Sequence, residues 1–180
     1  MLDEKTFIQT LLHPKTQSAA FRELLQWYQK PLYYHVRNIV LNHDDADDVL
    51  QNTFIKVFQN LKNFKGDSKL FSWMYRIATN EALTFIKQRA KKQGISSEEV
   101  QKKALANLPG DVWFDGNEIQ LKLQNAIAIL PNKQQSVFKM KYFQELKYEE
   151  IAEITGTSVG ALKASYFHAV KKIEDYLKTN

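Results

Sequence analysis

Apolar residues recur at helical spacing in nearly every segment of this 180-residue chain. Four such stretches lie in the first half, at about 21–28, 32–40, 46–61 and 70–89. Residues three and four apart share one face of an α-helix, so this spacing predicts amphipathic helices that each bury one face. Alternation of apolar and polar residues, which would indicate strands, is hard to find. The chain is therefore expected to be all-α.

The helical pattern weakens after about residue 90, where charged residues mix with Ser, Gly and Pro, and it returns at Glu118. This composition is typical of a linker, although a run within it, EEVQKKALANL, is compatible with a short helix. We expect two small helical domains, 1–90 and 117–180, joined by a linker at 91–116. Domains of this size have small cores and are only marginally stable alone.

Composition excludes several classes of protein. The chain has no Cys, which removes disulfides, thiol nucleophiles, iron–sulfur clusters and the usual structural zinc site. No apolar run is long enough to cross a bilayer, and MLDEKTFIQT lacks the order of a secretory signal, so we expect a cytoplasmic protein without membrane insertion. A net charge of +5 favours a polyanionic partner.

Residues 146–177 have the rhythm of a helix-turn-helix. A short helix is predicted over 148–155, ended by Gly156 in the left-handed conformation, and Thr157 or Ser158 is placed to cap the longer second helix. The predicted core stripe of that helix is Leu162, Tyr166, Ala169, Ile173 and Leu177. The residues on its other faces, which are candidates to meet DNA, are Lys163, Ser165, Phe167, His168, Lys171 and Lys172. An ordinary helical hairpin with solvated lysines is the alternative.

Four acids, Asp44, Asp45, Asp47 and Asp48, crowd the start of a predicted helix. Acids are favourable there because they complement the helix dipole. The run lacks the glycine and distal glutamate of a calcium loop, and no second carboxylate cluster is near in sequence, so no metal or cofactor is expected. The cluster is either a helix cap or an acidic patch for a basic protein partner.

Residues 61–92 carry eight cations against Asp67 and Glu81, with five aromatic residues interleaved. The cations are Lys62, Lys65, Lys69, Arg76, Lys87, Arg89, Lys91 and Lys92. Cations beside aromatics suit single-stranded nucleic acid, because cations follow the phosphates and aromatic faces stack on bases. Helical spacing assigns Phe71, Tyr75 and Phe85 to the core, whereas Phe64 lies beside a glycine in a predicted loop.

Three segments, taken in order, resemble the extracytoplasmic-function (ECF) sigma factors, the smallest class of bacterial RNA polymerase specificity subunits. HDDADDVLQNTFIKVFQNL is similar to region 2.2, whose helix docks on the clamp of the polymerase. FKGDSKLFSWMYRIATNEAL is similar to the region that opens the -10 promoter element, and the segment from LPNKQQ to VKKIE is similar to region 4, which reads the -35 element. The resemblance implies a non-catalytic initiation subunit made of a region 2 bundle and a region 4 helix-turn-helix.

The resemblance also implies roles for particular residues. The polymerase-binding residues would be Asp45, Asp48, Gln51, Asn52 and Phe54. The residues at the -10 element, some of which would hold a flipped base, would be Phe64, Lys65, Gly66, Asp67, Ser68, Trp73, Arg76 and Asn80. The residues at the -35 element, within 148–172, would be Ser158, Lys163, Ser165, His168, Lys171 and Lys172.

Two departures from the family pattern stand out. Met74 takes the place of the second of two tryptophans of housekeeping sigma factors. The pair of side chains that would wedge into the -10 DNA is therefore expected to be weaker, so that the promoter would need a better match to the -10 element. The recognition helix is poor in arginine, with Ala164 and His168 among the replacements. Reading of the -35 element is therefore expected to depend more on phosphate contacts and groove shape.

The implied partners are core polymerase, through its clamp and flap regions, promoter DNA, duplex at -35 and single-stranded at -10, and an anti-sigma factor. Two other classes stay open. A stand-alone helix-turn-helix regulator would bind a palindrome without polymerase. A helical enzyme would use the acids at 44–48 as metal ligands and His35, His43 or His168 as general base.

Overall fold

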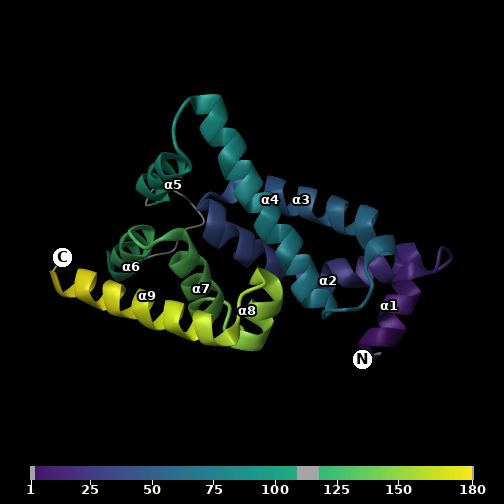
Figure 1. Cartoon of the computed structure of the whole chain (residues 1–180). Helices are drawn as coiled ribbons and strands as arrows, with labels where there is room; N and C mark the ends of the chain where they lie inside the picture. The colour runs from purple at the N-terminus through teal and green to yellow at the C-terminus, as the bar shows by residue number, and fades with distance from the viewer. Residues whose placement is uncertain (1–2, 109–117, 180) are drawn as a thin grey trace.

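The computed structural model describes residues 3–108 and 118–179, and every regular element in those ranges is helical (Figure 1). The first half contains α1 (Glu4–Leu12), α2 (Gln17–Val40), α3 (His43–Asn60), the 3-10 turn η1 (Leu61–Asn63) and α4 (Leu70–Gln93). The second half contains α5 (Ser97–Ala106), α6 (Glu118–Ala128), α7 (Asn132–Tyr142), α8 (Tyr148–Thr155) and α9 (Val159–Thr179). The all-α prediction is confirmed. No helix of the described ranges has the length and apolar character that a membrane span requires.

Helices α2, α3 and α4 pack on one another as an N-terminal bundle. Its centre is completely buried and includes Leu24, Leu32, Val36, Val57 and Met74. The turn between α2 and α3 is sharp because Leu41 adopts a left-handed conformation with φ 62°. Helix α3 then begins at an N-cap, where the Asn42 side chain accepts a hydrogen bond of 2.9 Å from the Asp45 amide.

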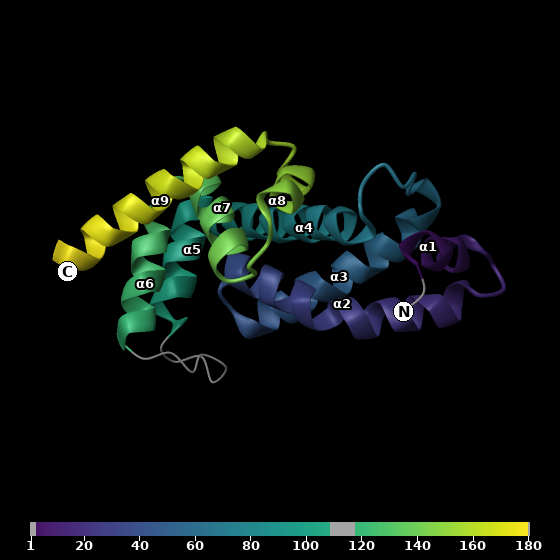
Figure 2. The same cartoon turned by 90° about the horizontal axis from the view of Figure 1, so that it is seen from below.

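Helices α6, α7 and α9 enclose a second, smaller core. The predicted turn before α9 is confirmed: Gly156 ends α8 with φ 69°, and the Ser158 hydroxyl accepts a hydrogen bond of 3.3 Å from the Ala161 amide. Leu162, Ala169 and Ile173 of the predicted stripe are buried. The prediction for Leu177 is wrong, because it lies 42% exposed on the last turns of α9, which run past α6 and α7 (Figures 1 and 2).

The segment predicted as a linker contains a helix, α5. It begins with a capping box, in which Ser96 and Glu99 satisfy each other's backbone amides. Helix α4 ends just before it at Gly94, with φ 64°. Helix α5 contacts both α4 and α6, while residues 109–117 lie outside the described part of the chain.

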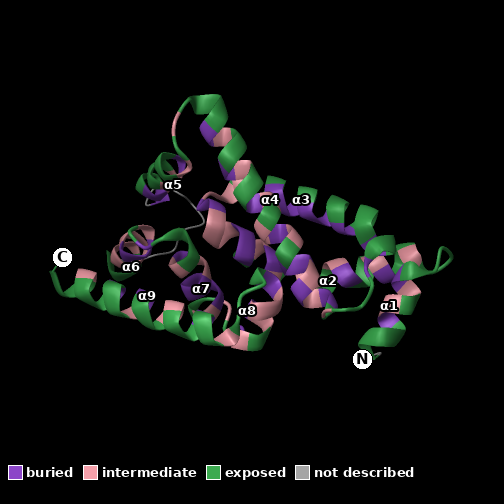
Figure 3. Cartoon of the chain, viewed as in Figure 1, coloured by how far each residue is buried: buried purple, intermediate pink, exposed green. Residues whose placement is uncertain are grey.

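The two halves of the chain pack against each other, chiefly through α8 on α4 (Figures 1 and 2). The main core is continuous across this contact, since it joins Leu146, Ile151 and Ile154 to the buried side of α4. The outer face of α9, in contrast, is largely exposed (Figure 3). The helix-turn-helix is thus held against the N-terminal bundle by its first helix, with the second helix facing outward.

Candidate protein and nucleic-acid interfaces

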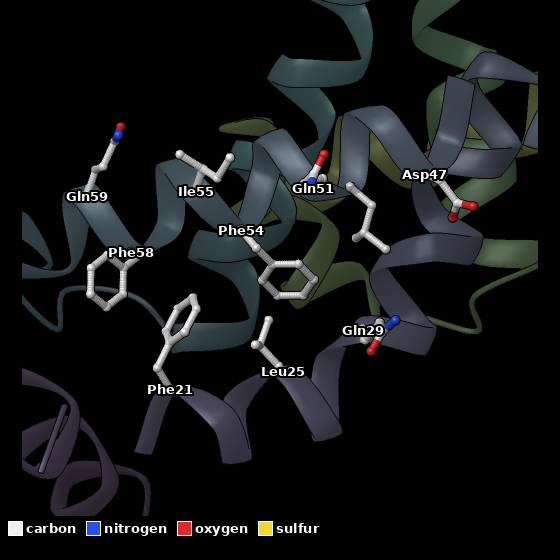
Figure 4. A pocket seen from close by; sticks show the side chains of 10 residues that line it. Phe21, Leu25, Gln29, Asp47, Gln51, Phe54, Ile55, Phe58 and Gln59 are labelled. Atoms are coloured by element: carbon white, nitrogen blue, oxygen red, sulfur yellow. The ribbon is translucent and has the colours of Figure 1, made fainter. Parts of the chain in front are cut away.

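An apolar groove runs between α2 and α3. Phe21 and Leu25 of α2 face Phe54 and Phe58 of α3 across it (Figure 4). The Phe21 and Phe58 rings meet edge to face with centroids 5.0 Å apart, and Phe58 remains 43% exposed. Polar side chains at the margins of the groove are Gln29, Asp47, Gln51 and Gln59. An open apolar groove with a polar margin is typical of a protein-binding site.

The residues predicted to bind polymerase occupy three different settings on α3. Gln51 and Phe54 line the groove, and Asp48 and Asn52 are exposed on the same helix. Asp45 instead pairs with Arg89 of α4. Burial raises the pKa of Asp45, although the Arg89 guanidinium acts in the opposite direction. The structure therefore brings four of the five predicted residues to the open side of α3 and uses the fifth to join α3 to α4.

The loop between η1 and α4 is anchored by aromatic packing. Phe64 is 8% exposed and packs on Trp73, with ring centroids 5.0 Å apart. Beyond it the chain turns at Gly66, whose φ of 76° favours glycine, and Lys65 and Asp67 are exposed. Phe64 thus supports the loop from inside, and the backbone and polar side chains of the loop form its surface.

The aromatic residues of α4 follow the core prediction to different degrees. Tyr75 is buried, as predicted, while Phe71 and Phe85 are only half-buried. Of the two residues at the expected DNA wedge, Met74 is completely buried among core side chains. Trp73 is half-buried. Asn80, further along α4, is exposed.

Two cations next to this loop contact the C-terminal half of the chain. Arg76 donates hydrogen bonds to the backbone carbonyl oxygens of Glu153 and Ile154 at the end of α8. A helix C-terminus carries partial negative charge, so it favours a guanidinium there. Lys69 lies 3.7 Å from the Glu150 carboxylate of the same helix. Of the predicted -10 residues, Arg76 is therefore held by α8, whereas Lys65, Asp67 and Asn80 stay exposed.

A buried polar contact also joins the halves. His35 Nδ1 lies 3.0 Å from the Gln144 side-chain oxygen, and its Nε2 lies 2.7 Å from the Thr79 hydroxyl oxygen, both within hydrogen-bond distance. Burial lowers the pKa of His35 to about 4, so the imidazole is neutral at pH 7. His43 lies instead beside Asp47 within α3, and His168 is exposed on α9. The described residues hold no group of acids and histidines arranged for a metal.

The residues predicted to meet the -35 element lie along the outward side of the helix-turn-helix. Ser158, Lys163, His168 and Lys171 are exposed, as is Lys172, and Ser165 is half-buried. The Lys163 ammonium lies 5.8 Å from the centre of the Tyr148 ring, which links the first turn of α9 to α8. Phe167 is 66% exposed beside His168. Most of this set is accessible, but it spreads around α9 over more than one face of the helix.

Comparison with known proteins decides the family. The model for Sigma-70 region 2 matches residues 24–92, and that for Sigma-70 region 4 matches residues 120–173. The chain is 31% identical over 147 residues to RNA polymerase sigma factor YlaC of Bacillus subtilis, covering 80% of this chain and 83% of that one. It is 27% identical over 167 residues to the ECF RNA polymerase sigma-E factor of Haemophilus influenzae, covering 88% of each. The chain is an ECF sigma factor.

Solved structures agree with this assignment at the level of fold. CnrH in complex with the cytosolic domain of CnrY superposes with a TM-score of 0.70 at 19% identity, covering 98% of both chains. The sigma factor RpoE of Bartonella quintana, in complex with the anti-sigma factor NepR, gives a TM-score of 0.65 at 20% identity, covering 89% of this sigma factor and 98% of that chain.

Membership in the family settles the general activity of the protein. This sigma factor binds core RNA polymerase and directs promoter-specific initiation, and the catalytic site belongs to the polymerase. It is not an enzyme. The resemblance that was based on three sequence segments is confirmed, and the alternative of a regulator that acts without polymerase is wrong.

Sequence reasoning missed two features of these surfaces. Ile55 and Phe58 border the α2–α3 groove but were not singled out, although the run FIKVF carries more apolar residues than one helix face can bury. The contact of Arg76 with α8 was also missed, because its acceptors are backbone carbonyls and these leave no trace in the residue pattern.

Proposed function

We propose that the α2–α3 groove and the exposed side of α3 form the surface to which the polymerase clamp binds. Two neighbouring properties support this assignment: Ile55 and Phe58 offer apolar area, while Asp48, Gln51 and Asn52 offer polar contacts along one helix. Apolar contacts supply affinity and the flanking charge supplies orientation. Asp45 acts through its pairing with Arg89, which holds α3 against α4.

The chain is proposed to act as two domains, 1–90 and 117–180, connected by 91–116. The loop at 64–68 with Trp73, Arg76 and Asn80 would hold the single strand of the -10 element. The outward side of α9 would enter the major groove at -35. Lysine there makes point-charge contacts rather than the two-pronged contacts of arginine, so we expect phosphates and groove shape to carry much of this recognition.

One observation carries the proposal that the observed arrangement is a resting form: α8 of the helix-turn-helix sits on α4 and is bonded by Arg76. The -35 and -10 elements are about 25 base pairs apart, which is about 85 Å of B-form DNA at 3.4 Å per base pair. Domains in direct contact do not span that distance. Promoter binding therefore requires α8 to leave α4, which also frees Arg76 for DNA.

An anti-sigma protein is proposed as a further partner, and the cytoplasm as the place where the sigma factor meets polymerase. The support for the partner is that two structures of similar fold were solved as complexes, one with the cytosolic domain of CnrY and one with the anti-sigma factor NepR. A protein that keeps α8 on α4 would hold the sigma factor inactive.

The test is run-off transcription with purified core polymerase on genomic promoter fragments, combined with the Asp48→Arg variant. We expect initiation from a discrete set of promoters, and at least about a tenfold loss of core affinity in the variant, because one carboxylate contact becomes a repulsion. Glu23→Arg, which makes the same charge change on the exposed part of α2, is the matched control. Equal core affinity of Asp48→Arg and the control would remove Asp48 from the interface.

A further inference from the structure

A cavity of about 450 Å³ lies where the two halves of the sigma factor meet. Its walls come from α2, α4, α5 and α7, and from the segment that leads from α7 to α8. This volume is in the range of small-molecule sites. Three lysines line it, Lys87, Lys133 and Lys139, against a single acid, Glu98. The cavity is therefore positively charged, and it lies away from the surfaces assigned to polymerase and DNA.

Lys139 is the unusual member of this set. Its side chain is only 6% exposed, and it makes no hydrogen bond or ion pair with any residue that the structure describes. Burial lowers the pKa of Lys139 to about 8, so it is still mostly protonated at neutral pH. Other cations between packed elements have acceptors: Arg76 has the carbonyls of α8, and Arg89 has Asp45. An ammonium in so buried a residue without a counter-charge is costly, so an anion that pairs with Lys139 would be stabilised in this cavity.

Neutral donors surround the same space. The Gln144 amide nitrogen is buried without a partner, while the oxygen of that side chain lies 3.0 Å from His35 Nδ1. Helix α7 starts at the wall of the cavity, and its N-cap is Pro131, which provides no side-chain acceptor for the first amides. Helix α5, which also starts there, is closed by its capping box. The start of α7, Lys139 and Gln144 therefore all lie at the wall of the same cavity.

Apolar side chains form another part of the wall. Ile86 and Met140 are buried, Ile39 is half-buried, and Leu83 of α4 is partly exposed at the cavity. A purely inorganic ion would leave this apolar area unused. The lining therefore fits a molecule with a charged end and an apolar body.

We propose that this cavity binds a small organic oxyanion, whose carboxylate or phosphate group pairs with Lys139 and whose apolar body lies against Met140 and Ile86. The ligand touches both halves of the chain. It therefore binds the closed form, in which α8 packs on α4, and not an open form in which the halves have separated. By mass action it therefore stabilises the closed form and lowers the fraction of sigma factor able to bind a promoter. The site does not depend on the residue assignments for polymerase and DNA.

The test is titration calorimetry of the full-length protein with three probes: benzoate, phenyl phosphate and inorganic phosphate. We expect saturable binding of benzoate or phenyl phosphate, at least tenfold weaker in Lys139→Met. Lys5→Met, which removes an exposed lysine of α1 far from the cavity, should bind like the unmodified protein. Whichever organic probe binds better assigns the headgroup as a carboxylate or a phosphate.

A second measurement separates a ligand role from a structural one. Without ligand, Lys139→Met is expected to melt at a higher temperature than the unmodified protein, because it removes an unpaired buried charge. Lys139→Gln, which keeps a polar end, should show the same loss of probe binding. The proposal is overturned if neither organic probe binds, if Lys139→Met binds as tightly as Lys5→Met, or if inorganic phosphate alone accounts for the binding.

Discussion

The two surfaces proposed to read DNA differ in how the folded chain presents them. On α4, α8 packs on the helix, and Arg76 of the -10 set is bonded to it. On α9, the -35 side is open, with Lys163, His168 and Lys171 exposed. The first helix of the helix-turn-helix thus holds Arg76 of the -10 surface, while its second helix stays available. The closed form is thus expected to bind duplex DNA but not to open it.

A covalent lock on the closed form should have the largest effect, because it would block use of the -10 surface while leaving the -35 surface available. The chain has no Cys, so a Lys69→Cys, Glu150→Cys double variant offers only two thiols, at positions whose side chains now lie 3.7 Å apart. A short bismaleimide joining them should reduce run-off transcription to background while binding to a -35 duplex is retained. Each single variant treated in the same way is the control. Full transcription by the crosslinked protein would show that α8 need not leave α4.

The pKa of His35 offers a reading of whether the halves are in contact. In the closed form it is about 4, against an ordinary value of 6.5, because burial disfavours the charged ring. Below pH 6.5 the unfolded chain takes up the proton first, so stability falls as the pH drops from 6.5 to 4 and then levels off. At pH 5 this amounts to about 2 kcal/mol.

The measurement is an NMR titration of the four histidines, with His35→Gln to assign the signal, together with urea unfolding at pH 7.5 and pH 5. The His35→Gln variant should lose less stability between these two pH values than the unmodified protein. A His35 signal that titrates near 6.5 would mean that the halves are already apart in solution.

Arg76→Met should weaken the packing of α8 on α4 without disturbing the core. The substitution keeps the apolar stem and removes the hydrogen bonds to α8, which we expect to cost the closed form about 1 kcal/mol, or about a fivefold shift toward the open form. Hydrogen–deuterium exchange of the α8 amides should become faster by the same factor. Arg22→Met, at an exposed position of α2, is the control and should leave α8 unchanged.

The smallest effect is expected on the open surface. Lys163→Ala should lower the slope of log affinity against log salt for a -35 duplex by about one, since one phosphate contact is lost. Because α9 is exposed in the closed form, the change should be the same in free and crosslinked protein. An unaltered slope would place Lys163 outside the DNA interface, and a change seen only in the free protein would mean that the closed form also hides α9.

Local features of the fold were largely predictable from the sequence, and long-range ones were not. The bounds of α8 and the turn at Gly156 follow from capping chemistry within a few residues, which a single sequence contains. The packing of α8 on α4 depends on carbonyls and shape matching between segments about 80 residues apart, which periodicity does not encode. Leu177 shows the same limit, because its stripe position predicts burial, whereas it is 42% exposed and the adjacent Tyr176 packs on the second core instead.

The candidate sites divide in a similar way. Motifs pointed to α3 for polymerase binding, which stays a prediction, but the groove beside α3 exists only because α2 brings Phe21 and Leu25 there. The cavity around Lys139 had no signal at all in the sequence, where Lys139 is one of three lysines in NKQQSVFKMKY and resembles any solvated cation. Its character comes from four helices that meet only in the folded chain.

The bond between Arg76 and α8 has a consequence for how this protein tolerates mutation. Its acceptors belong to the main chain, so any residue at position 153 presents the same oxygen. Substitutions there are free to accumulate without loosening the closed form, as long as α8 keeps its shape. Arg76, by contrast, bonds the end of α8 in the observed form and is proposed to contact the promoter once α8 has left α4. A saturation scan should find it among the least replaceable surface positions of α4, opposite one of the most replaceable positions of α8.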